Sequence, residues 1–130
     1  MTLEVRQVTK KYKDFVAVNA LDFTINEGEV FGLIGQNGAG KTTLMKIMLG
    51  LLKADQGDVR ILGESVRFGN TPTNQHVGYL PDVPSFYPYM TAYEYLLFCG
   101  EVTGLDKKVR VERAKRYLAL VGLPFNRKRI

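Results

Sequence analysis

The sequence predicts an α/β fold in which antiparallel strands come first, a strand, a glycine-rich turn and a helix follow, and two more helices end the chain. Three observations support this prediction. Residues 21–25 alternate between apolar and polar side chains, as in a half-buried strand. The apolar run 30–34 leads into glycine-rich residues 35–40 and then into a helix-forming segment. Residues 91–94 carry the signature of a helix N-terminus.

The first part of the chain consists of short runs with strand character, separated by polar turns. A strand of residues 3–9 is expected to be followed by a turn at 10–14. Two short strands should come next, at 16–18 and 21–25. After a turn at 26–28, the apolar run 30–34 has the length and composition of a buried strand.

The segment after this run contains every part of a phosphate-binding loop, or P-loop. The glycines let successive backbone N–H groups point at one place, and a helix starting at about Gly40 adds the positive end of its dipole. Lys41 would reach the β- and γ-phosphates, and the Thr42 hydroxyl is placed to ligate Mg²⁺. The sequence therefore predicts binding of a nucleoside triphosphate with Mg²⁺, against the alternative of a glycine-rich turn without a ligand. The loop residues are Gly35, Gln36, Asn37, Gly38, Ala39, Gly40, Lys41, Thr42 and Thr43.

The helix after the loop is indicated by apolar residues at helical spacing, and it should fade near Lys53. Further strands are expected at 59–62 and 76–80, with a loop at 68–74. Thr91 and Glu94 form a capping-box pattern, which predicts a helix from Thr91 to about Gly104. A second helix should cover about 107–121. The apolar residues of the helix after the loop are Leu44, Ile47, Met48 and Leu51.

The net charge of +5 is concentrated at the end of the chain. Residues 1–106 hold nine Lys/Arg and twelve Asp/Glu, whereas residues 107–130 hold nine Lys/Arg and a single acid, Glu112. A contact with nucleic acid or anionic lipid is one interpretation of this basic segment. A solvated helix face is favoured instead, because no aromatic residues interleave the basic ones as single-strand binding requires. We therefore expect no nucleic-acid partner.

Cysteine content and hydropathy indicate a soluble chain of single-domain length. Cys99 stands alone, so no internal disulfide can form, and a reducing cytosolic compartment fits. Its place in an apolar helical stretch favours a buried, inert thiol. The start of the chain does not resemble a signal peptide, and no apolar run approaches the roughly 20 residues of a membrane span. Docking on a membrane protein remains compatible with these features.

Over the whole chain, these residues resemble the ATP-binding domains of ABC transporters. Asn37 and the doubled threonine in the loop are typical of that family. Residues 8–12 resemble the segment that supplies an aromatic ring to the adenine. Farther on, residues 55–63 resemble the family's strand pair after the P-loop helix, 77–82 the strand entering its Q-loop, and 86–98 the start of its helical subdomain.

The resemblance implies the N-terminal half of an ABC-type P-loop NTPase: an antiparallel β subdomain, the P-loop strand and helix, and the start of a helical subdomain. Residues 1–84 would belong to the nucleotide-binding core, and 85–130 to the helical subdomain. Tyr12 would stack on the base, residues 35–41 would hold the phosphates, and Thr43 would support the α-phosphate. Asp82 stands where the family most often has a metal-contacting glutamine. A carboxylate can also coordinate Mg²⁺, so metal binding and an ordinary loop acid both stay open for Asp82.

The implied cofactors are ATP and Mg²⁺, and the implied partners are a transmembrane transporter subunit and a second ATP-binding domain in a dimer. The location would be cytoplasmic, peripheral to the inner face of the membrane. Phe86, Tyr87 and Tyr89 are candidates for the contact with the transmembrane partner, whereas Tyr95 and Phe98 are expected in the helical core. The run at 79–82 is more similar to exporter-type members of the family, among them multidrug and antibiotic transporters.

Several family segments do not occur in these 130 residues. There is no Leu-Ser-Gly-Gly stretch, no strand with a metal-binding Asp followed by a catalytic Glu, and no switch histidine. We therefore expect no catalytic residue here, little hydrolysis by this chain alone, and a chain that is one part of a longer domain. Its strand 30–34 would then lack both neighbours. A non-catalytic nucleotide-binding or interaction module is the alternative, and a small nucleotide kinase is disfavoured because no lid is found.

Overall fold

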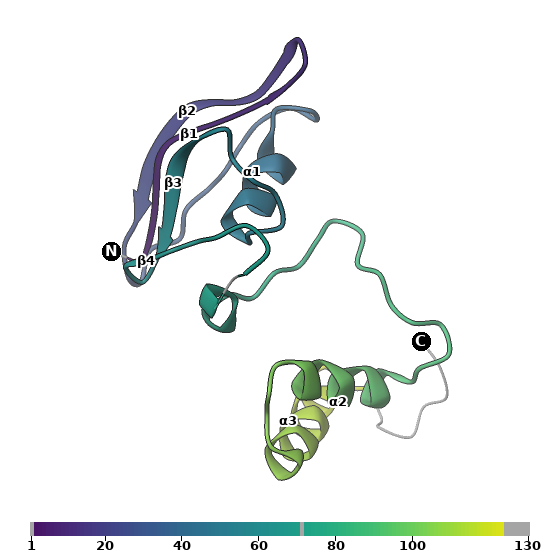
Figure 1. The fold of residues 1–130 in the computed structure, drawn as a ribbon. Helices are drawn as coiled ribbons and strands as arrows, with labels where there is room; N and C mark the ends of the chain where they lie inside the picture. Colours follow the sequence, from purple (N-terminus) through teal and green to yellow (C-terminus); the bar gives the residue numbers. More distant parts are fainter. Residues whose placement is uncertain (1, 71, 124–130) are drawn as a thin grey trace. The chain divides into compact units, whose positions relative to one another are not determined.

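The computed structural model describes residues 2–70 and 72–123, and it divides the chain into two compact units, Met1–Gly78 and Tyr79–Ile130 (Figure 1). The first unit holds the sheet and the helix after the glycine-rich loop. The second holds a helical hairpin. The boundary of 84/85 drawn from the sequence stays a prediction about the longer domain.

The sheet of the first unit is antiparallel throughout, with strand order β2-β1-β3-β4. The expected antiparallel β subdomain is present. The two short strands expected at 16–18 and 21–25 are one strand, because pairing with β1 continues through an irregularity between them. The strands are β1 (Leu3–Tyr12), β2 (Phe15–Ile25), β3 (Gln56–Ile61) and β4 (Glu64–Ser65).

Helix α1 (Lys41–Met48) packs its apolar side on this sheet and forms a core with it. It ends earlier than the sequence predicted. Gly50 takes a φ of 68° and donates its N–H to Ile47 O, and Leu51 donates to Lys46 O at 2.8 Å, which together close a Schellman motif. Leu51 therefore leaves the helical stripe and is 61% exposed. The buried core comprises Val5, Val8, Val18, Leu44, Ile47 and Val59.

Two strands predicted from apolar composition are not formed among the described residues. Residues 30–34 and 76–80 form no strand with another segment. The short 3₁₀ helix η1 (Pro72–His76) occupies part of the loop expected at 68–74 and includes the first residue of the strand expected at 76–80. A strand is defined by its ladder to a neighbour, and apolar composition alone cannot supply one. Val30 and Ile34 are accordingly almost fully exposed, at 101% and 95%.

The second unit contains α2 (Ala92–Val102) and α3 (Lys107–Leu120), close to their predicted bounds. The capping box is confirmed: Glu94 N–H donates to Thr91 Oγ1 at 3.1 Å, and Thr91 N–H donates to Glu94 Oε2 at 2.7 Å. Gly100 is buried where the helices meet, since a Cβ there would lie 2.7 Å from Arg110 Cβ. No helix in the described part of the chain is long and apolar enough to span a bilayer.

Candidate nucleotide-binding site

The glycine-rich loop lies immediately before α1 and turns back on itself. Ala39 N–H donates to Gln36 O at 3.0 Å, and Gly38 and Gly40 both take left-handed backbone angles, with φ of 85° and 90°. Such backbone angles are unfavourable for residues that carry a Cβ. The loop is thus a tight backbone curl that leads directly into the helix.

Gly40 is required by space as well as by backbone angle. A Cβ at this position would lie 2.0 Å from Ala17 O of β2, so no side chain fits between the loop and the strand. At Gly35 a Cβ would lie 2.9 Å from Ala39 Cβ. A glycine at position 40 thus lets the loop lie directly against β2, and a glycine at position 35 lets the loop close on itself.

Lys41 folds its ammonium group back into the curl. Its Nζ donates to Gly35 O and, at 3.1 Å, to Gln36 O. The carbonyls orient a positive charge at the mouth of the loop without neutralising it, since neither is an anion. A polyphosphate reaching this point would meet a fixed cation.

The N-terminus of α1 adds a second source of positive potential. Its N-cap is Gly40, which has no side chain to accept the first N–H groups, and no acidic residue lies in the first turn. The N–H groups of Lys41, Thr42 and Thr43 therefore have no partner within the helix, whose ladder begins with Leu44 N–H on Gly40 O at 2.9 Å. Such an end favours anions. Thr42 is exposed at the same end of the helix.

Tyr12 belongs to the same unit, at the end of β1, and is 46% exposed. Lys10 Nζ lies 5.5 Å from the ring centroid and 3.3 Å from Asp55 Oδ1. Asp55 Oδ2 also accepts the Lys11 N–H at 2.7 Å. This backbone hydrogen bond, with help from Lys10, holds the pKa of Asp55 below its usual range. The sequence reasoning missed these supports, because Asp55 is distant from Tyr12 in the chain.

A hollow of about 340 Å³ lies beside the loop in the first unit. Residues 16–19 of β2 line one part of it and residues 39–41 another. The structure thus brings the predicted loop residues 35–43 together with the strand that pairs with the Tyr12 segment. Asp82 is exposed in the second unit, so its role at the metal stays a prediction.

The second unit gathers aromatic rings around α2. Phe86 packs edge-on against Tyr95 at 5.1 Å between centroids, and Tyr87 packs against Phe98 at 5.7 Å. The nearby Cys99 thiol, then burial, raises the pKa of Tyr95. Tyr89 is 69% exposed, the most open ring of the group.

The sequence model of the ABC transporter family matches residues 18–130. The chain belongs to the ABC transporter family of ATP-binding proteins. It is 39% identical over 121 residues to the uncharacterized ABC transporter ATP-binding protein YxlF of Bacillus subtilis (strain 168), covering 93% of this chain and 39% of YxlF. It is 32% identical over 128 residues to the bacitracin transport ATP-binding protein BcrA of Bacillus licheniformis, covering 98% of this chain and 41% of BcrA. The chain thus spans about two fifths of the length of these relatives.

Solved structures of the ABC family confirm the fold. An ATP-binding cassette of an ABC transporter superposes with a TM-score of 0.80 at 27% identity, covering 98% of this chain and 57% of the other. The ATP-binding subunit of another ABC transporter gives a TM-score of 0.78 at 28% identity, covering 95% and 52%. The predicted class, the N-terminal part of an ABC-type P-loop NTPase, is therefore correct. The family match includes the P-loop but starts after Tyr12, so base stacking by Tyr12 stays a prediction.

Proposed function

We propose that this chain binds MgATP through residues 35–43. The observation that carries the proposal is the Lys41 ammonium, which is held by two loop carbonyls at the open N-terminus of α1. A backbone curl, a fixed cation and three free helical N–H groups form a donor set suited to a polyphosphate.

Individual roles follow from this arrangement. Residues 35–41 would hold the phosphates, Thr42 would ligate Mg²⁺, and Thr43 would support the α-phosphate. Mg²⁺ bound there would neutralise phosphate charge. Tyr12 would stack on the adenine with one face of its ring. In the longer domain, Asp82 would help to coordinate Mg²⁺.

The longer protein would be the ATP-binding subunit of an ABC transporter, and ATP hydrolysis would drive transport across a membrane. Support comes from the relatives, which include the probable multidrug ABC transporter ATP-binding protein YbhF of Escherichia coli (strain K12), 36% identical over 121 residues. The subunit would lie at the inner face of the membrane, contact a transmembrane subunit and dimerise with a second ATP-binding domain. Phe86, Tyr87 and Tyr89 would form part of the contact with the transmembrane subunit.

Hydrolysis by these 130 residues alone is not expected. The P-loop supplies phosphate binding and charge neutralisation, whereas hydrolysis also requires a positioned water and a base near it. A steady-state assay should therefore show little turnover. Turnover that disappears in Lys41→Ala would contradict this part of the proposal.

Calorimetric titration with ATP and GTP, with and without Mg²⁺, tests nucleotide binding. Lys41→Ala should weaken ATP binding by at least about tenfold, the order expected for losing a charge-assisted contact. Lys46→Ala is the matched control, because Lys46 lies exposed in the last turn of the same helix. It should bind like the parent. Equal ATP affinity in the parent and Lys41→Ala, both folded, would overturn the proposal.

A further inference from the structure

The hairpin of β1 and β2 has three register shifts, of which the first two are opposed bulges and the third lies between Lys10 and Lys11. Val5 pairs with Phe23 and Val8 pairs with Leu21, so β1 carries one extra residue between these pairs. That residue is Gln7, whose φ is 48°. The same irregularity appears against β3, where the register shifts between Arg6 and Thr9. A bulge of this kind bends a strand and leaves a backbone group without a ladder partner.

The compensating extra residue on β2 is Ala20. It lies between the pairs Val8–Leu21 and Lys10–Val18, and its φ is 43°. Left-handed angles are uncommon for residues with a Cβ, so two of them at neighbouring positions must be held by their surroundings. The hairpin curves along its length in Figure 1.

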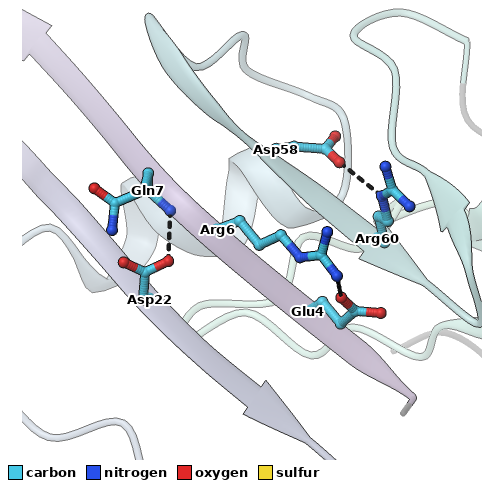
Figure 2. Close-up of polar contacts among 6 residues, drawn as sticks. All are labelled: Glu4, Arg6, Gln7, Asp22, Asp58 and Arg60. Carbon is cyan, nitrogen blue, oxygen red and sulfur yellow. Dashed lines mark hydrogen bonds and ion pairs between the residues drawn. The ribbon is translucent and has the colours of Figure 1, made fainter.

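Each strand supplies a side chain that satisfies the bulge of the other. The Gln7 N–H on β1 donates to Asp22 Oδ1 on β2 at 2.8 Å (Figure 2). The Ala20 N–H on β2 donates to Thr9 Oγ1 on β1 at 2.9 Å. Thr9 is 4% exposed, so water cannot easily replace its hydroxyl. The bend is therefore fixed by a reciprocal pair of side-chain acceptors.

The third strand leaves room for this bend. A Cβ at Gly57 of β3 would lie 2.4 Å from Gln7 O and 2.5 Å from Arg6 O. Gly57 also has a φ of 89°. The bulged backbone of β1 thus packs closely against a glycine at the start of β3.

Beyond the bend, the hairpin meets the P-loop. A Cβ at Gly40 would lie 2.0 Å from Ala17 O of β2 and 3.4 Å from Val18 Cγ2. The partners of this part of β2 are Lys10 and Lys11, directly before Tyr12. The direction of the hairpin end therefore sets both where the P-loop lies and where the Tyr12 ring lies.

We propose that Asp22 and Thr9 are positioning residues for the nucleotide base: by holding the two bulges, they direct the Tyr12 end of the hairpin toward the P-loop. The inference rests on the proposed function, in which residues 35–43 hold the phosphates and Tyr12 stacks on the adenine. Both side chains act through the backbone. Their removal should weaken recognition of the base while leaving recognition of the phosphates.

The test compares ATP with inorganic tripolyphosphate, which has phosphates but no base. Both ligands are titrated calorimetrically with Mg²⁺ into the parent chain and its variants. Asp22→Ala should lower ATP affinity about fivefold, the order of a weakened base–aromatic stack, and leave tripolyphosphate affinity within about twofold. Thr9→Val should behave in the same way.

Three variants serve as controls. Asp22→Asn keeps a carbonyl oxygen for the Gln7 N–H, and Thr9→Ser keeps the hydroxyl for the Ala20 N–H, so both should retain the parental ratio of the two affinities. Asp58→Ala removes a half-buried acid from β3. Among the described residues, the Asp58 carboxylate accepts a hydrogen bond only from a side chain, that of Arg60, through Nε at 2.9 Å (Figure 2). It should bind both ligands like the parent.

The outcomes separate the two proposals. A parental affinity ratio in Asp22→Ala and Thr9→Val, or an equal loss of both ligands in folded variants, would overturn the positioning role. If circular dichroism shows that Asp22→Ala is unfolded, the ratio of ATP affinity to tripolyphosphate affinity in Thr9→Val decides whether the positioning role holds. If the parent binds neither ATP nor tripolyphosphate, the proposed function itself fails.

Discussion

At the scale of single residues, the P-loop shows why sequence motifs can identify a site before its geometry is known. Gly35, Gly38, Gly40 and Lys41 were predicted from their spacing, and the structure brings them into one curl. The motif did not reveal the contact of Gly40 with Ala17 O, because that contact joins segments more than 20 residues apart. Asp55 beside the Tyr12 segment was missed for the same reason.

Gly40 and Gly38 allow backbone strain to be separated from steric exclusion. Both have left-handed angles, but a Cβ at Gly38 meets nothing within 4 Å. Gly38→Ala should lower the free energy of unfolding by about 1–2 kcal/mol through backbone strain. Gly40→Ala should lower it by at least about 1 kcal/mol more, because the Cβ also collides with Ala17 O. Urea denaturation measures both, and equal effects would show that the contact with β2 relaxes freely.

At the scale of elements, local signals worked where an element depends on its own residues. The capping box of α2 was predicted correctly because Thr91 and Glu94 are neighbours in the chain. The end of α1 was predicted too late because Gly50 was not recognised as its stop signal. The predictions of strands at 30–34 and 76–80 were wrong, since each strand depends on a neighbour that no described segment supplies.

The capping box makes α2 sensitive to acid. The hydrogen bond from the Thr91 N–H, followed by that of its side chain, lowers the pKa of Glu94 from its usual value. Since the folded pKa is the lower one, this stabilisation is fully present above the ordinary glutamate value of about 4.3 and is lost as the pH falls through the lowered value. Helix content followed by circular dichroism should therefore decrease in this window.

Glu94→Gln is the control for this pH dependence. A glutamine can still accept the Thr91 N–H but does not titrate, so the variant should lose this part of the acid transition. The pKa of Asp55 is also lowered, first by the hydrogen bond from the Lys11 N–H. The comparison is therefore made between parent and variant at each pH. Identical acid profiles for helix content would argue against the role of Glu94.

At the scale of the whole molecule, much apolar surface is left uncovered in the described residues. Val30 and Ile34 are almost fully exposed, and a hollow of about 400 Å³ in the first unit is lined partly by the core residues Val8, Ile47 and Val59. Uncovered apolar segments of strand character favour association with other chains or segments. In the proposed longer protein, further strands would cover them.

The exposed segment should make this chain self-associate. Replacing Val30 and Ile34 together by serine should reduce association in sedimentation velocity and change the free energy of unfolding by no more than about 0.5 kcal/mol per site. Leu44→Ser is the contrasting variant, because Leu44 is 1% exposed and its replacement should unfold the first unit. If the double variant is as unstable as Leu44→Ser, the segment is packed in solution and the prediction is wrong.

The sequence by itself identified the P-loop motif and the capped helix, because each depends on residues close together in the chain, and the resemblance carried by its motifs indicated the family and the antiparallel strands. Tertiary structure alone decided that Ala17 O closes against Gly40, that Asp55 supports the Tyr12 segment, and that Asp22 and Thr9 hold opposed bulges. Apolar composition marks a residue as one to be buried. Which neighbour buries it depends on how distant segments meet.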